Sequence, residues 1–127
     1  MADFKKLQVW QKAHALALSA NTSAGRIRGA TYSSLRSQLV RAAMSIDANI
    51  VEGRGQRTDK EFARYLSIAI NSTNELESHL IMARDIGAMG VHEFSTLLDQ
   101  LIEVRRMLHG LLTRITTSKL STTSRAD

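Results

Sequence analysis

The chain has 127 residues and a formal net charge of +5, and it contains no cysteine and no proline. Its length fits a single domain. The lack of cysteine excludes disulfides, thiolate metal sites and cysteine nucleophiles, and the lack of proline favours long helices over a loop-rich or all-β fold. Hydrophobic residues make up 43% of the chain, which is enough to bury a core. We therefore expect one helical domain over residues 1–118.

Targeting and membrane signals are not evident in the sequence. Gln11, Lys12 and His14 interrupt the apolar residues near the N-terminus, so these residues do not have the continuous apolar core of a signal peptide. No apolar run approaches the roughly 20 residues that span a bilayer. We therefore expect a cytoplasmic protein with no membrane partner.

The first of four amphipathic patterns covers about residues 3–24. Its apolar stripe recurs at alternating steps of three and four residues, as one face of a helix does. The stripe comprises Leu7, Trp10, His14, Ala17 and Asn21, widened by Val9, Ala13 and Leu16. Gly25 and Gly29 are expected to end this helix.

The second helix is predicted over about residues 32–52. Gly53 stands where a left-handed C-cap would end it, and the N-cap candidates are Thr31, Ser33 and Ser34. On a wheel of about 100° per residue, one apolar group forms the predicted core face, namely Leu35, Leu39, Ala42, Ala43, Ile46 and Ile50. A second apolar group lies on another face and comprises Val40, Met44, Ala48 and Val51.

This second apolar group predicts self-association. A four-helix bundle buries one stripe per helix, so the group would form a contiguous exposed apolar strip, which soluble monomers usually avoid. We therefore expect a homo-oligomer whose interface contains Val40, Met44, Ala48 and Val51.

The third and fourth helices are predicted over about residues 59–87 and 91–116. Thr58 and Glu61 have the spacing of a capping box, so Thr58 is the expected N-cap. Apolar positions in both helices alternate at steps of four and three, which keeps one seam facing a neighbouring helix. The seams comprise Phe62, Leu66, Ala69, Thr73, Leu76, Leu80 and Ala83, and then Leu97, Leu101, Val104, Leu108, Leu111 and Ile115.

Together the four patterns predict an all-α fold, an up-down-up-down antiparallel four-helix bundle. Residues 119–127 are polar, and we expect them to form a flexible tail.

Basic residues are concentrated in the first half of the chain. Residues 1–57 carry nine Lys and Arg and three acids, whereas residues 58–118 carry six Lys and Arg and eight acids. An excess of arginine around one helix favours polyanion binding, and a solvated surface is the structural alternative. The candidate nucleic-acid-binding residues are Arg26, Arg28, Arg36, Arg54 and Arg57.

The second helix also has a polar face, which contains Gln38, Arg41, Ser45, Asn49 and Glu52. These residue types could bind an anion or position a water. Arg41 and Glu52 are three turns apart, however, and cannot pair within one helix. We therefore favour a structural or interface role for this face.

The same residues carry a family resemblance. The motif Arg-x-x-x-Ser-Ile-x-x-Asn-Ile-x-Glu-Gly runs from residue 41 to residue 53 and includes Arg41, Ser45, Asn49, Glu52 and Gly53. With the residues around it, this motif resembles the four-helix bundle proteins that are also called 23S rRNA intervening-sequence proteins, over roughly residues 4–115. The resemblance implies a closed ring of bundles, typically a homopentamer, whose biochemical function is not established.

A related branch of that family implies a binding role. The accessory proteins of diversity-generating retroelements form a basic pentamer that binds nucleic acid and a reverse transcriptase. The present sequence departs from the family pattern in the connection over residues 25–35, which lacks the usual proline and is more basic than expected. Val51 and Asn71 stand where alanine and glycine are usual, so close packing at those points could differ.

Enzyme motifs are not found in the sequence. No glutamate is followed three residues later by a histidine, as a di-iron bundle requires, and Glu75 and His79 would supply only two metal ligands. Residues 53–58 lack the spacing and the lysine of a phosphate-binding loop, and no serine stands in a nucleophile elbow. We expect no catalysis, metal, cofactor or small-molecule substrate, which leaves nonspecific RNA or DNA binding or a protein-interaction scaffold.

Overall fold

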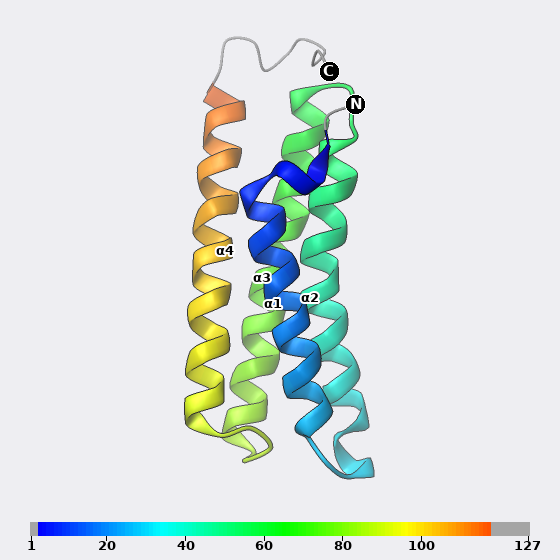
Figure 1. Cartoon of the computed structure of the whole chain (residues 1–127), viewed down its shortest axis with the longest axis vertical. Coiled ribbons are helices and arrows are strands. Elements are labelled where there is room, and N and C mark those ends of the chain that lie inside the picture. The colour runs from blue at the N-terminus through cyan, green and yellow to red at the C-terminus, as the bar shows by residue number, and fades with distance from the viewer. Residues whose placement is uncertain (1–2, 118–127) are drawn as a thin grey trace.

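The computed structural model describes residues 3–117 and contains four long helices, each antiparallel to the next (Figure 1). Their bounds are α1 Gln8–Arg26, α2 Ser33–Arg54, α3 Asp59–Asp85 and α4 Val91–Thr117. Short 3-10 helices precede α1 and α2, namely η1 Phe4–Lys6 and η2 Ala30–Tyr32. Within residues 3–117 there is no strand, so the prediction of an all-α four-helix bundle is confirmed. The predicted tail, 119–127, lies outside the described residues.

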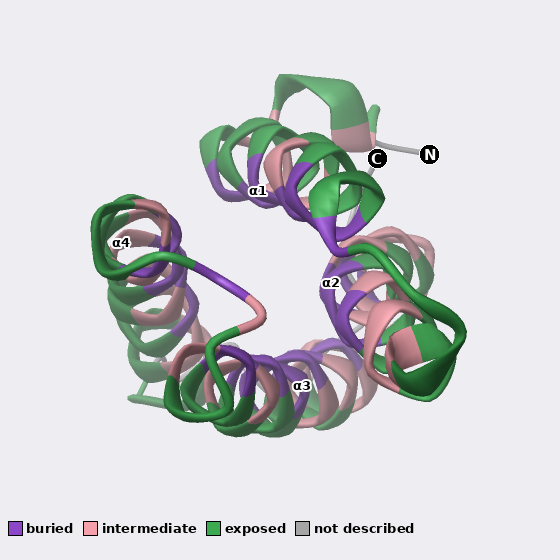
Figure 2. Ribbon diagram, turned by 90° about the horizontal axis from the view of Figure 1, so that it is seen from below, coloured by how far each residue is buried: buried purple, intermediate pink, exposed green. Residues whose placement is uncertain are grey.

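The helices surround one core in the order α1, α2, α3, α4, and their buried residues face inward (Figure 2). The contact between α2 and α3 is the most extensive, whereas the contact between α1 and α4 is the least extensive of the neighbouring pairs. None of the described helices is long and apolar enough to cross a bilayer.

The buried face of α1 differs from the predicted stripe. The core face comprises Val9, Ala13 and Leu16, which were expected only to widen the stripe, together with Ala20 and Ala24, which were not predicted. Two residues of the predicted stripe, His14 and Asn21, are exposed, and Trp10 is half-buried. The reason is that α1 packs on both α2 and α4, so its core face lies between these neighbours and the predicted stripe lies on the side toward α2.

The start of α1 is also later than predicted. Asp3 caps the short helix η1, because its carboxylate accepts a hydrogen bond from the backbone N–H of Lys5 at 3.0 Å. Leu7 then adopts an extended conformation, and α1 begins at Gln8.

The entry into α2 lacks the predicted side-chain cap. Gly29 has a φ of 101° and turns the chain into η2, which leads directly into α2. The N-cap position is Tyr32, and no side chain caps it. The prediction of Thr31, Ser33 or Ser34 as N-cap is therefore wrong. The chain enters α2 directly from the 3-10 turn of η2, and not from an extended residue whose side chain could cap the helix.

Gly53 does not end α2, which corrects a second prediction. The helix continues to Arg54, and its C-cap is Gly55 with a right-handed φ of −80°. Gly53 is buried, and a Cβ atom built on it would lie 2.8 Å from Cβ of Tyr65 and 2.9 Å from Cδ1 of Phe62. Gly53 thus allows α2 and α3 to approach closely.

The predicted seams of α3 and α4 are confirmed. All seven predicted seam residues of α3 are buried, as are Leu97, Leu101, Val104 and Leu108 of α4. Leu111 and Ile115 are half-buried and pack against this core. Thr58 is the N-cap of α3, and its Oγ1 accepts a hydrogen bond from the N–H of Glu61 at 3.2 Å.

Candidate interaction surfaces

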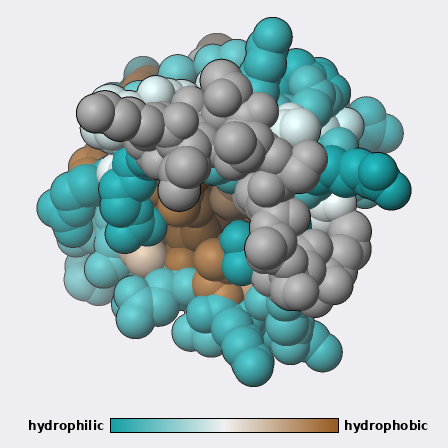
Figure 3. All heavy atoms as spheres, turned by 90° about the horizontal axis from the view of Figure 1, so that it is seen from above, coloured by the Kyte–Doolittle hydropathy of each residue, from teal (hydrophilic) through white to brown (hydrophobic). Residues whose placement is uncertain are grey.

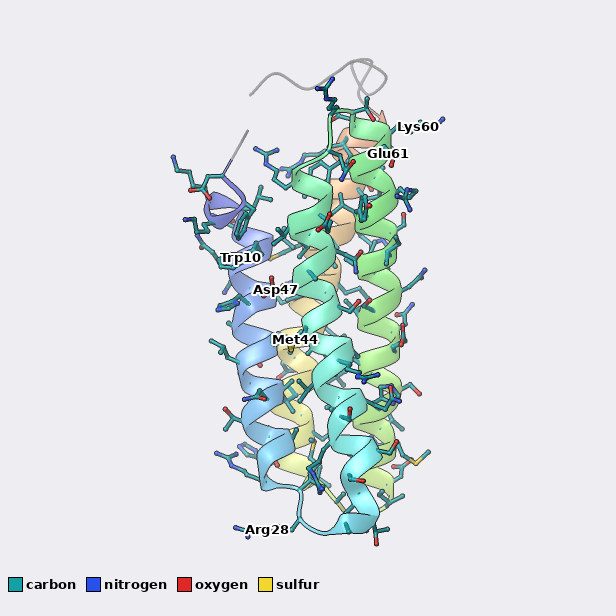
Figure 4. All side chains as sticks on the ribbon, turned by 90° about the vertical axis from the view of Figure 1, so that its right-hand side faces the viewer. Trp10, Arg28, Met44, Asp47, Lys60 and Glu61 are labelled. Atoms are coloured by element: carbon teal, nitrogen blue, oxygen red, sulfur yellow. The ribbon has the colours of Figure 1, made fainter. Side chains whose placement is uncertain are left out.

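The second apolar group of α2 is only partly covered in the single chain. Val40 and Val51 are half-buried, whereas Met44 and Ala48 are exposed, and the exposed fraction of Met44 is 58%. We call these four residues the α2 strip. Figure 4 shows Met44 near the edge where α2 lies beside α1.

A polar cluster ties α1 to α2 beside this strip. The indole N–H of Trp10 donates to Oδ1 of Asp47 at 2.7 Å, and Nδ1 of His14 lies 2.9 Å from Oδ2 of the same carboxylate. The rings of Trp10 and His14 are stacked, with 4.8 Å between their centroids. Sequence reasoning missed this cluster and assigned Trp10 to the core.

Three residues of the family motif lie at the contact between α2 and α3. The Ser45 hydroxyl lies 2.8 Å from the Ser72 hydroxyl of α3. Asn49 donates to the backbone oxygen of Ser45 at 2.8 Å and to its hydroxyl at 3.2 Å. Gly53 lies against α3 one turn further on. The other two motif residues, Arg41 and Glu52, are exposed.

The arginines near the start of α2 have different environments. Arg26 forms an ion pair with Glu93 of α4 at 3.0 Å. Arg36 donates from Nη1 to the backbone oxygens of Ile27 at 3.0 Å and Gly29 at 2.8 Å, so it holds the connection between α1 and α2. Arg28 is exposed at the lower end of the bundle (Figure 4).

The remaining two candidate arginines, Arg54 and Arg57, lie at the opposite end. At about 1.5 Å per residue, the 22 residues of α2 place about 33 Å between its two ends. The structure therefore divides the five predicted binding residues into two groups. Arg57 is exposed and Arg54 is half-buried.

The upper end of the bundle contains further basic residues that sequence reasoning missed. Helix η1, the end of α2, the start of α3 and the end of α4 meet there (Figure 1). We call this surface the basic end, and its basic residues are Lys5, Lys6, Arg54, Arg57, Lys60, Arg64 and Arg114. Fewer acids lie at this end, namely Asp3, Glu52, Asp59 and Glu61. Combining the antiparallel topology with charge positions could have identified it.

A pocket opens at the basic end between α1 and α4. It is lined by Leu7, Val9, Met107 and Leu111, with Lys6 and Arg114 among its polar residues. Figure 3, viewed from above, shows hydrophobic surface at this end surrounded by hydrophilic side chains. No group of three or more metal-ligating side chains occurs in the part of the chain that the structure describes.

Comparisons with known proteins agree on the fold. The model of the 23S rRNA-intervening sequence protein family matches residues 5–110. The chain is also similar to a crystal structure from Bacteroides thetaiotaomicron, described as a protein with unknown function from the S23 ribosomal protein family. The TM-score is 0.75 at 21% identity, over 82% of this chain and 97% of that chain. No match was found among curated proteins.

Proposed function

The chain belongs to the 23S rRNA-intervening sequence protein family, and from this premise we propose that it is a non-enzymatic, self-assembling protein that binds nucleic acid. The observation that carries the self-assembly part of the proposal is the α2 strip, because Met44 and Ala48 expose apolar surface that a second copy of the chain could cover. In this proposal the partner is another copy of the chain, and the assembly is a ring, most simply the homopentamer that the resemblance implies.

Assembly would bring several copies of the basic end together. In a ring whose axis runs along the bundles, rotational symmetry places every basic end on the same face. Phosphate groups would then meet a repeated array of lysine and arginine side chains, and binding would be electrostatic and independent of sequence. The observation that supports this location is the excess of basic over acidic side chains at that end.

Base stacking has no part in the proposed binding. Proteins that hold single strands by stacking present aromatic rings along a basic groove. Here Trp10 is half-buried and bonded to Asp47, and Phe62 and Phe94 are buried in the core. We therefore propose that affinity falls steeply with salt and differs little between sequences.

A protein-interaction scaffold is the second candidate function. The pocket between α1 and α4 favours it, since apolar side chains beside charged ones are typical of protein-binding surfaces. In that case the basic end would flank a protein partner, and binding to nucleic acid would be weak even at low salt.

Two measurements test the proposal. Light scattering coupled to size exclusion gives the mass of the assembly, and fluorescence anisotropy gives its affinity for labelled RNA and DNA of unrelated sequence across a salt series. We expect a mass of several chains, and we expect Arg57→Ala, Lys60→Ala and Arg114→Ala combined to weaken binding by about tenfold or more. Arg28→Ala at the lower end is the control. Lack of binding at low salt by the assembled protein would refute the nucleic-acid role and favour the scaffold.

A further inference from the structure

We infer that a second pocket, where the end of α1 lies against the start of α4, binds a small zwitterion, namely an α-amino acid with an apolar side chain. We call this site the seam pocket. The inference goes beyond the proposed function, because it requires neither assembly nor nucleic acid. It follows from the packing of the two helices, from buried polar groups without partners, and from an ion pair that lines the pocket.

The seam pocket lies at the lower end of the bundle, where α1 ends and α4 begins (Figure 1). The contact between α1 and α4 is the least extensive of the neighbouring pairs. Near its end α1 contributes small side chains to this seam, namely Ser19, Thr22 and Ser23. They leave a volume of about 410 Å³, to which Leu18 and Leu97 contribute apolar surface. Small-molecule sites measure about 300–1,000 Å³, so the pocket fits a ligand at the small end of that range.

Two buried polar side chains at this seam lack hydrogen-bond partners. Ser23 is 5% exposed and lines the pocket, and its hydroxyl forms no hydrogen bond to any residue that the structure describes. Oε1 of Gln100, one turn of α4 beyond Thr96, is buried and also lacks a partner among the described residues. Buried polar groups normally have partners, because an unsatisfied group costs free energy. The Ser23 hydroxyl is therefore available to a ligand, whereas the Thr22 and Thr96 hydroxyls donate to backbone oxygens of their own helices.

The ion pair between Arg26 and Glu93 selects the charge of the ligand. Nη1 of Arg26 lies 3.0 Å from Oε2 of Glu93, and both residues line the seam pocket. The Arg26 side chain is 69% exposed, and exposed ion pairs contribute little to stability, so this pair can exchange its partners at small cost. A lone anion would be attracted by Arg26 and repelled by Glu93, and a lone cation would meet the reverse. A ligand that carries both charges is attracted by both residues.

An α-amino acid has the chemistry that this arrangement recognises. Its ammonium and carboxylate are attached to one carbon atom, so they can face two side chains that lie side by side. The guanidinium of Arg26 donates to the carboxylate, and the ammonium donates to the carboxylate of Glu93. An apolar side chain packs against Leu18 and Leu97, and Leu18 is 58% exposed without it. A neutral ligand would leave the ion pair as it is and gain only the weaker contacts with hydroxyl groups.

Calorimetric titration of the full chain with L-leucine tests the inference. Two derivatives of L-leucine keep the apolar side chain and remove one charge each, because N-acetyl-L-leucine retains only the carboxylate and L-leucinamide retains only the ammonium. We expect saturable binding of one L-leucine per chain. Each derivative should bind at least about tenfold more weakly, because it loses a hydrogen bond between charged groups and leaves Arg26 or Glu93 beside an uncharged group.

Two substitutions assign each charge of the ligand to its partner. Glu93→Gln should weaken binding of L-leucine by about tenfold and should not weaken binding of N-acetyl-L-leucine, which has no ammonium. Arg26→Met should weaken binding of both carboxylate-bearing ligands and should not weaken binding of L-leucinamide. The matched controls are Lys12→Met and Glu103→Gln, because Lys12 and Glu103 form another exposed ion pair between α1 and α4, at 3.4 Å, and neither lines the seam pocket. Both controls should leave all three affinities unchanged.

Several results would overturn the inference, with circular dichroism confirming that each variant is folded. L-leucine must bind saturably to the unmodified protein, and an absence of such binding refutes the site. If N-acetyl-L-leucine binds as tightly as L-leucine, the pocket is a simple anion site, and if L-leucinamide does so, it is a simple cation site. Equal losses in the Lys12 and Glu103 variants would show that the effect comes from the packing of α1 on α4. The mass of the assembly and its affinity for RNA are measured separately, so the proposed function can fail without this inference, and the reverse.

Discussion

Gly53 of α2 lies so close to Phe62 of α3 that a Cβ atom at Gly53 would be 2.9 Å from Cδ1 of the ring. The same Cβ atom would be 2.8 Å from Cβ of Tyr65. Side-chain rotation cannot relieve this second clash, because the Cβ atom of Tyr65 is bonded directly to the backbone. The α2 and α3 helices make the most extensive contact in the bundle. The close contact between α2 and α3 therefore requires glycine at position 53.

Replacing Gly53 by alanine should destabilise the protein. Overpacking costs typically 1–3 kcal/mol, and the gain in helix propensity of about 1 kcal/mol offsets part of it, so we expect a net loss of up to about 2 kcal/mol in urea unfolding. The control is Gly110→Ala within α4, where a Cβ atom would meet nothing within 4 Å, and it should raise stability by about 0.5–1 kcal/mol. Equal effects of the two substitutions would contradict the close-packing role.

The carboxylate of Asp47 should control the environment of Trp10, the single tryptophan of the chain. Asp47→Ala leaves the indole N–H and the His14 ring without their shared acceptor, so we expect about 1–2 kcal/mol less stability and a change in tryptophan fluorescence. Asp99→Ala, at an exposed position of α4, should change neither. Unaltered emission in Asp47→Ala would show that the hydrogen bond is not maintained in solution.

Sequence patterns predicted the elements whose determinants are local. The alternating steps of α3 and α4 identified their buried seams because a repeated spacing defines one face of a helix. The same steps in α1 defined a face that is not the core face, because the positions of α2 and α4 decide which face of α1 is buried. Thr58 was identified as a cap because its partner, Glu61, is only three residues away.

The missed features depend on residues far apart in the chain. Trp10 and Asp47 are separated by 37 residues, and nothing in either segment specifies their pairing. Gly53 fits the local pattern of a helix end, but it lies inside α2. Glycine is needed there because Phe62 and Tyr65 of α3 leave no room for a Cβ atom. The basic end required knowledge of which helix termini meet, and the position of Arg36 required the course of the preceding loop.

The hydroxyl of Thr73 should stabilise the bundle through Arg105 of the neighbouring helix. It is fully buried, donates to the backbone oxygen of Ile70 at 2.6 Å and accepts from Nε of Arg105 at 3.0 Å. Thr73→Val keeps the shape but leaves that guanidinium N–H without its acceptor, so we expect a loss of about 1–2 kcal/mol. Thr96→Val is the control, since that exposed hydroxyl bonds only within its own helix. A double-mutant cycle with Arg105→Met should show coupling at Thr73 and none at Thr96.

Arg36 should contribute to stability rather than to nucleic-acid binding, although it was among the residues predicted to contact nucleic acid. Its two hydrogen bonds to the oxygens of Ile27 and Gly29 hold the connection between α1 and α2. Because bonds from a charged donor contribute about 1.5–3 kcal/mol, Arg36→Ala should lower the free energy of unfolding by about 2 kcal/mol. Its effect on affinity for labelled RNA at low salt should be less than about twofold, well below that of the basic-end variant.

Arg28→Ala is the matched control for Arg36, because Arg28 is exposed in the same connection. As a surface substitution it should change stability by no more than about 0.5 kcal/mol. The free energy of unfolding and the affinity for RNA therefore distinguish a structural role of Arg36 from a phosphate-binding role. If Arg36→Ala unfolds at the same urea concentration as the unmodified protein and binds RNA as weakly as the basic-end variant, Arg36 is a phosphate ligand, and the lower end of the bundle belongs to the binding surface.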